Sequence, residues 1–246
     1  MTKWTKRTIF LFASISFLTG LFFQYVSVYY RMDVDIIDTY KAIDVEENIY
    51  DGMITYGEKD SKIGIVFYPG EKVEYTAYEP LMRSLAGKGF FCVLLEMPYN
   101  LAVFGIGSAN GITEKYPAVD KWYMMGHSLG GAMAGTYLAD NYRKYDGLIL
   151  LASYVTNDLT HTDLDVISIY GTEDKVLNMD KYNKYKVNLP DGYQEMIIDG
   201  GNHAYYGVYG EQKGDGQAKI SNEQQIKQTV DILRILLVNN KRDYKM

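Results

Sequence analysis

The stretch "MMGHSLGGAMAG", residues 124–135, places Ser128 in a Gly-x-Ser-x-Gly pattern between an apolar run and a line of small residues. The run before Ser128 is predicted to be a strand and the residues after it a helix, which is the setting of a nucleophile elbow. Gly126 and Gly130 permit a sharp turn that holds the serine in strained backbone geometry. The stretch therefore predicts a serine nucleophile; the competing interpretation is a glycine-rich strand-to-helix turn of the nucleotide-binding kind.

A serine hydroxyl needs a base to take its proton. The chain has three histidines. We expect His127 to point away from the neighbouring Ser128 hydroxyl, and His161 precedes the candidate acids. His203, in the glycine-flanked loop "DGGNHAYYG" (199–207), is therefore the expected base.

The base in turn needs a carboxylate to orient it. In "ISIYGTEDKV" (167–176), a β-branched run ends in a turn that carries Glu173 and Asp174. We prefer Asp174, because its shorter side chain lies just past the glycine turn, and we keep Glu173 as the alternative. Either residue could instead be a solvated turn acid.

A tetrahedral oxyanion requires hydrogen-bond donors. The N–H of Leu129, directly after the serine, is the first expected donor. The second should come from a loop after an earlier strand, where the chain has "FYPGEKVE" (67–74). The N–H of Glu71 is the candidate and that of Gly70 the alternative, although an ordinary Pro-Gly turn would look the same.

Beyond residue 31, apolar runs alternate with amphipathic stretches, which predicts an α/β fold with a mostly parallel sheet and helices on both faces. A Ser221–Gln224 capping box begins the closing helix. The short connection from 153 to 165 leaves no room for a helical lid. The expected strands are 40–45, 50–56, 63–70, 90–98, 121–126, 147–153, 164–171 and 193–199, and the expected helices are 78–89, 129–142, 179–187 and one after 221.

The N-terminal segment differs from the rest, since residues 8–30 carry no charge. As a helix this run is about 34 Å long, enough for a hydrocarbon core of about 30 Å. Basic residues precede it and acidic residues follow it (Lys3, Lys6 and Arg7; Asp33, Asp35 and Asp38), which favours an N-terminus in the cytoplasm and a domain outside. A cleaved signal peptide, and so a secreted protein, is the main alternative, and a buried core helix is a third.

We therefore expect a membrane anchor in residues 1–30, a linking segment in 31–47 and the catalytic domain in 48–246. The net charge of −6 gives no basic surface for nucleic acid. The single cysteine, Cys92, excludes an internal disulfide and a multi-thiolate metal site, and its neighbours indicate a buried thiol. No metal and no organic cofactor is expected, and the oligomeric state stays open.

Two further signals have plainer explanations. "GIGSAN" (105–110) matches half of a dinucleotide-binding fingerprint, but it lacks the final glycine and a strand directly before it, so we expect an ordinary loop. Tyr205, Tyr206 and Tyr209 follow the candidate base and could line an acyl or aromatic pocket. Tyrosines on half-buried strands and loops are the more common explanation.

Together these stretches resemble a serine hydrolase of the α/β-hydrolase superfamily, close to the small lidless esterase and dienelactone-hydrolase-like group. The order Ser128, Asp174, His203 is that of this superfamily. The resemblance covers most of residues 48–240. It rests on residues 67–74, 97–104, 122–135, 170–176, 200–210 and 214–225. Glu71 departs from related chains, which often have a second glycine there, and a nucleophilic serine separates this chain from dienelactone hydrolases that use cysteine.

The resemblance implies a carboxylesterase-type hydrolase that cleaves a small or medium acyl ester through an acyl-enzyme. Two alternatives remain open. An acyltransferase would share the same catalytic residues, and a non-catalytic surface binding protein could use the same fold.

Overall fold

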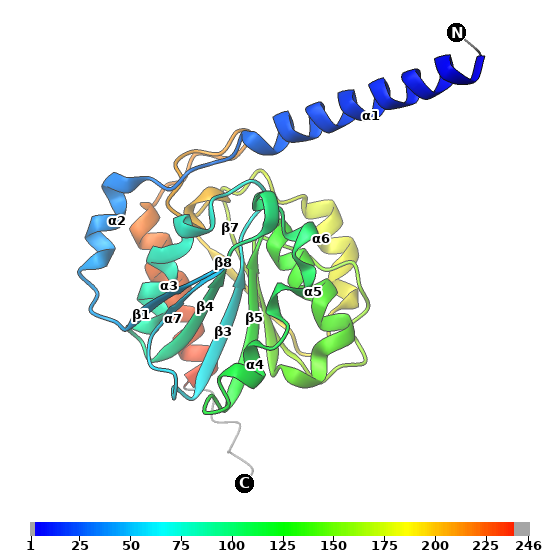
Figure 1. The fold of residues 1–246 in the computed structure, drawn as a ribbon. Coiled ribbons are helices and arrows are strands. Elements are labelled where there is room, and N and C mark those ends of the chain that lie inside the picture. The colour runs from blue at the N-terminus through cyan, green and yellow to red at the C-terminus, as the bar shows by residue number, and fades with distance from the viewer. Residues whose placement is uncertain (1–2, 239–246) are drawn as a thin grey trace.

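An eight-stranded sheet with helices on both faces forms the centre of the protein (Figure 1). The computed structural model describes residues 3–238, so the ends of the expected anchor (1–2) and of the expected domain (239–246) lie outside the described residues. The strands run in the order β1-β2-β4-β3-β5-β6-β7-β8. The strands from β4 to β8 in this order pair in parallel, whereas β2 is antiparallel to both of its neighbours, β1 and β4. The predicted fold class is confirmed.

The strands are β1 (Glu47–Tyr50), β2 (Met53–Tyr56), β3 (Ile63–Tyr68), β4 (Phe90–Leu95), β5 (Lys121–His127), β6 (Gly147–Leu151), β7 (Asp165–Gly171) and β8 (Gln194–Ile198). The α-helices are α1 (Lys3–Ser27), α2 (Val34–Lys41), α3 (Glu79–Ala86), α4 (Ile112–Lys115), α5 (Leu129–Asn141), α6 (Met179–Tyr185) and α7 (Asn222–Val238). The expected capping box is present, since Ser221 and Gln224 exchange backbone-to-side-chain hydrogen bonds of 2.9 and 3.1 Å.

The expectation for the start of the domain was partly wrong. Residues 40–45 form no strand, because Tyr40, buried in the core, and Lys41 complete α2, whose start is capped by the side chain of Asp33, and residues 42–45 form the turn and loop that follow. The expected strand 50–56 is divided between β1 and β2. Gly52, at a φ of 74°, makes the turn of this hairpin.

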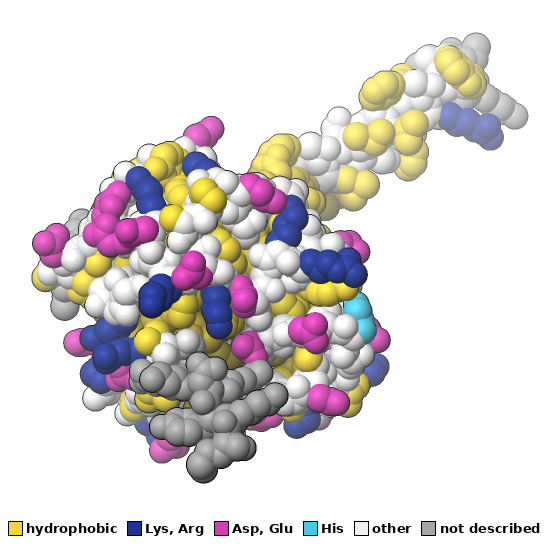
Figure 2. All heavy atoms as spheres, turned by 90° about the horizontal axis from the view of Figure 1, so that it is seen from below, with side chains coloured by type: hydrophobic (Ala, Val, Ile, Leu, Met, Phe, Trp, Pro, Cys, Tyr) yellow, Lys and Arg dark blue, Asp and Glu magenta, His cyan; other side chains and the backbone are white. Residues whose placement is uncertain are grey.

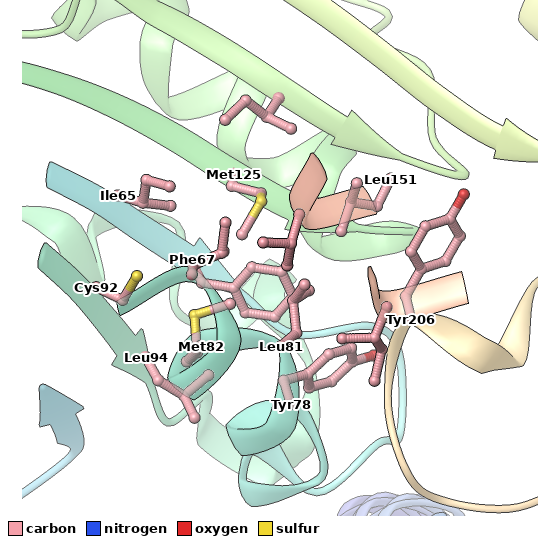
Figure 3. Packing of buried hydrophobic residues seen from close by; sticks show 14 of the residues in the cluster. Ile65, Phe67, Tyr78, Leu81, Met82, Cys92, Leu94, Met125, Leu151 and Tyr206 are labelled. Atoms are coloured by element: carbon pink, nitrogen blue, oxygen red, sulfur yellow. The ribbon is translucent and has the colours of Figure 1, made fainter. Parts of the chain in front are cut away.

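Buried side chains on both faces of the sheet hold these layers together. On one face, Leu81 and Met82 of α3 pack against Phe67 and Met125 of the sheet (Figure 3). Cys92 lies in the same cluster, and its burial raises the pKa of the thiol. The predicted buried cysteine is confirmed.

The connection between β6 and β7 contains no helix, so the predicted absence of a helical lid is confirmed. The carboxyl ends of the parallel strands all lie on the side of the domain to which α1 is attached (Figure 1). The loops that follow β3, β5, β7 and β8 therefore meet next to the end of α1.

Helix α1 projects from the domain (Figure 1), and its apolar side chains are mostly uncovered. Residues Arg7–Ser27 are long and apolar enough to cross a membrane. Figure 2 views the protein from below. The visible side chains of α1 are mostly apolar, whereas charged side chains of both signs are scattered over this face of the domain.

Candidate active site

Ser128 lies at the turn between β5 and α5 in a backbone conformation that non-glycine residues seldom adopt, with φ 52° and ψ −123°. The turn is possible because its flanking glycines have no side chains. A Cβ on Gly126 would lie 2.5 Å from the carbonyl carbon of Gly130, and one on Gly130 would lie 2.2 Å from the carbonyl oxygen of Tyr68. The turn also places Ser128 at the N-terminus of α5, where free backbone N–H groups favour negative charge.

Asp174 and His203 are joined by a hydrogen bond of 2.9 Å between Oδ2 and Nδ1, and both side chains are almost completely buried. The other carboxylate oxygen of Asp174 accepts the N–H groups of Val176 and Leu177, each at 2.8 Å. These bonds fix the carboxylate and, through it, the plane of the imidazole. His203 Nε2 is buried and has no hydrogen-bond partner among the described residues.

Glu173, the alternative acid, is turned away from His203. Its Oε1 accepts from Lys219 Nζ at 2.6 Å, and this ion pair lowers the pKa of the Glu173 carboxyl. Of the two acids in the turn, only Asp174 contacts the histidine.

The loop that carries His203 is held by hydrogen bonds to residues that the sequence analysis did not single out. Asp215 Oδ2 accepts the N–H of Ala204 at 2.9 Å. The side chain of Asn202 donates to the carbonyl of Gly216 at 3.0 Å, and Gln225 of α7 holds the Asn202 backbone through two hydrogen bonds. The stretch "GDGQAK" (214–219) carries the only signal that could have suggested this role, a short acid between glycines.

The loop after β3 brings its backbone against the elbow. The N–H of Gly70 donates to the hydroxyl of Tyr78 at 3.1 Å, so it is already occupied. The N–H groups of Glu71 and Leu129 have no acceptor among residues 3–238. The geometry therefore leaves Glu71 and Leu129 available as donors and makes Gly70 the less suitable of the two candidates in the loop.

His127 lies closer to the site than the sequence suggested. Its Nδ1 is hydrogen-bonded to Tyr78 at 2.7 Å, and its ring lies 4.6 Å from that of His203. Burial holds the pKa of His127 well below 6.5, and the neighbouring His203 lowers it further, so His127 is neutral at pH 7. Sequence reasoning missed the buried chain Gly70–Tyr78–His127 because His127 lies 49 residues from Tyr78 and no local pattern links the two.

Two clefts open on Ser128 and His203. The first, cleft A, has a volume of about 440 Å³ and is bordered by Val28, Tyr29 and Tyr30 after α1, by residues 70–73, and by Gln212 and Lys213. The second, cleft B, has a volume of about 320 Å³ and is lined by Leu129, Ala132, Met133, Ala152, Tyr154 and Leu177, among others. Cleft A carries charged side chains, whereas cleft B is mostly apolar.

The plainer explanations of the remaining signals fit the structure. Tyr206 and Tyr209 are buried in the core, and neither they nor Tyr205 line cleft A or cleft B. The loop "GIGSAN" consists of short turns that cover Tyr68, whose hydroxyl donates to the carbonyl of Ile106 at 2.5 Å. Within residues 3–238, no three His, Cys, Asp or Glu side chains are grouped so that they could hold a metal ion.

Comparisons with known proteins agree with the fold. A family model described as "Alpha/beta hydrolase family" matches residues 64–227. No curated protein sequence matches the chain. Among solved structures, a predicted CIB-like hydrolase from Thermoplasma acidophilum is similar with a TM-score of 0.56 and 16% identity, over 78% of this chain and 98% of its own. The monoacylglycerol lipase of Paleococcus ferrophilus is similar with a TM-score of 0.57 and 12% identity, over 77% and 98%.

We predict that Tyr78→Phe lowers the free energy of unfolding by about 1–3 kcal/mol, because it leaves the N–H of Gly70 and Nδ1 of His127 buried without a partner. Denaturant titration measures the change. Tyr56→Phe is the matched control, since the Tyr56 hydroxyl is equally buried but has no hydrogen-bond partner among the described residues. Equal effects of the two substitutions would contradict the prediction.

We also predict that acid destabilises the protein through His127. Its pKa is low in the folded chain and returns to about 6.5 on unfolding, so below pH 6.5 only the unfolded chain binds this proton. The free energy of unfolding should then fall as pH falls, with a contribution of up to about 1.4 kcal/mol per pH unit. His127→Asn should remove this contribution between pH 6.5 and 5, and parallel stability curves for the two proteins would rule it out.

Proposed function

Because the chain belongs to the alpha/beta hydrolase family, we propose that it is a serine hydrolase that cleaves a small or medium acyl ester. One observation carries the proposal. The buried imidazole of His203 is held through Nδ1 by Asp174, its Nε2 has no hydrogen-bond partner among the described residues, and His203 and Ser128 both line clefts A and B. A neutral imidazole so held can accept a proton from a serine hydroxyl.

In the proposed reaction, Ser128 Oγ attacks the ester carbonyl while His203 Nε2 takes its proton. Asp174 stabilises the imidazolium that forms and keeps the ring in its orientation. The N–H groups of Leu129 and Glu71 stabilise the oxyanion. His203 then protonates the leaving alcohol, and a water molecule activated by the same imidazole releases the acid from the acyl-enzyme.

The two clefts suit different halves of an ester. Cleft B, which is mostly apolar, suits the acyl chain. Cleft A carries Lys72, Lys213 and Glu71 at its border and suits the more polar alcohol part. The side chain of Glu71 accepts a hydrogen bond from Tyr25 of α1 at 2.5 Å, so this carboxylate is directed toward the helix.

We further propose that α1 anchors the protein in a membrane as a single span, with its basic N-terminal end in the cytoplasm and the catalytic domain on the other side. The apolar side chains of α1 are exposed in the isolated chain, for example Phe10 and Phe17. An exposed apolar surface of this extent is normally buried against a partner or a membrane. The length of the apolar part of α1 matches the thickness of the hydrocarbon core of a bilayer.

The nucleophile is tested with a fluorophosphonate probe, which labels activated serines. We expect the wild-type chain to be labelled and Ser128→Ala to abolish labelling. The control variant Ser221→Ala removes a serine that lies well after Ser128 in the sequence, at the start of α7, and should still be labelled. Labelling that persists in Ser128→Ala would place the nucleophile elsewhere.

The acid is tested by a pair of neighbouring substitutions that each remove one negative charge. Asp174→Asn should lower kcat for p-nitrophenyl butyrate by about 10³–10⁴-fold, because an amide at this position favours the wrong imidazole tautomer. Glu173→Gln, which only breaks the ion pair with Lys219, should leave kcat within about twofold. Similar losses in both variants would contradict the assignment of Asp174.

A further inference from the structure

Helix α1 is joined to the domain without a spacer. Tyr30, three residues after the helix ends, pairs through its backbone with the loop after β3. Its N–H donates to the carbonyl of Lys72 at 2.7 Å, and its carbonyl accepts the N–H of Glu74 at 2.9 Å. The Tyr30 hydroxyl accepts the N–H of Lys213 at 3.1 Å. The segment that leaves the helix is therefore part of the wall of cleft A.

The last turns of α1 also contact the domain. The ring of Phe22 lies 5.4 Å from Tyr99 and 5.9 Å from Phe104. Tyr25 donates to Glu71, and Lys72 Nζ lies 4.2 Å from the centre of the Tyr25 ring. The Tyr25 contacts fix the helix to the loop that borders cleft A. The Phe22 contacts fix it to the neighbouring segment 97–104, whose Asn100 carbonyl accepts the N–H of Lys72 at 2.8 Å.

The length of the helix leaves no residues for a linker. The apolar span Arg7–Ser27 covers about 31 Å as a helix, close to the thickness of a hydrocarbon core of about 30 Å. If the span crosses a bilayer, its edge lies near Ser27. Phe22, five residues before Ser27, then lies about 7.5 Å inside this edge, so the rings that contact it reach the outer part of the hydrocarbon core. Tyr25 lies about 3 Å from the edge, close to the headgroups, where tyrosine and lysine side chains are common.

An exposed apolar surface surrounds this point. Tyr99, Val103 and Phe104 are 49%, 41% and 53% exposed, and two of them touch α1. We call these three residues the apron. Because the apron continues the apolar surface of α1 onto the domain, the occupant that fits it is the bilayer surface in which α1 is held.

We propose that the substrate is a membrane-resident amphiphile that carries a short or medium acyl ester, and that it reaches Ser128 from the bilayer through cleft A. This rests on the proposed esterase function and on the proposed anchor. The acyl group occupies cleft B, the oxygen end of the alcohol part lies in cleft A, and the apolar chain of the alcohol lies along the apron in the bilayer. The long chain of the alcohol part never has to leave the membrane. Hydrolysis transfers the acyl group to water and returns the alcohol to the bilayer.

The test uses the full chain reconstituted in phosphatidylcholine vesicles and two esters with the same acyl group. Ethyl butyrate is presented in water, and hexadecyl butyrate is presented in the bilayer. Released butyrate is measured for both. Since the acyl-enzyme is identical, any difference lies in how the ester reaches Ser128.

We expect hexadecyl butyrate to be hydrolysed at least about tenfold faster when it shares a vesicle with the protein than when it is held in separate vesicles, because co-localisation raises its effective concentration. The rate for ethyl butyrate should be the same in both arrangements. Equal rates for hexadecyl butyrate in the two arrangements would overturn the proposal, as would a chain that does not float with the vesicles. No hydrolysis of ethyl butyrate would instead refute the esterase function on which the proposal rests.

A substitution in the apron gives a second readout. Val103→Ser should slow the hydrolysis of hexadecyl butyrate in the shared vesicle several-fold and leave ethyl butyrate unaffected. Ile49→Ser is the matched control, since Ile49 is 73% exposed on the edge strand β1 and neither contacts α1 nor lines cleft A. Equal effects of the two substitutions on the vesicle substrate would show that the apron does not contribute.

Discussion

The close approach of two backbone turns is the constraint on which this site depends. Gly130 lies so near the end of β3 that any side chain there would overlap the carbonyl oxygens of Tyr68 and Pro69. The same approach brings the loop after β3 beside the start of α5. It thereby sets the distance between the N–H groups of Glu71 and Leu129, which come from different elements. A single packing requirement thus shapes both the strained serine and the proposed oxyanion site.

A second layer of buried polar groups holds these turns in register. Tyr78 joins the loop after β3 to His127 on the elbow, and Asp215 and Gln225 support the loop that carries His203. Each of these groups is satisfied only when the loops are correctly placed. Burial without a partner costs free energy, so the network favours one arrangement of the site over others.

The N-terminal helix is fixed to the candidate site in a way that a flexible tether would not be. Tyr25 and Tyr30 bind the same loop that supplies Glu71, so α1, this loop and cleft A form one continuous structure. A helix held this way sets the orientation of the cleft relative to the bilayer as well as its distance from it. The proposed route of the substrate follows from that geometry.

The sequence by itself determined the fold class, most of the strands and helices, the elbow glycines around Ser128, the capping box at Ser221 and the apolar length of α1, because these depend on local patterns of residues. It also narrowed the candidate acid to two residues and the base to one. It misjudged residues 40–45, where the helix that Asp33 caps extends to Lys41, with Tyr40 buried in the core, and a turn follows. Only the tertiary structure distinguished Asp174 from Glu173, joined Tyr78 to Gly70 and His127, and brought residues 28–30 to the cleft. Those outcomes depend on which segments far apart in the chain come together, and contacts of that kind arise from packing the whole domain rather than from any one stretch.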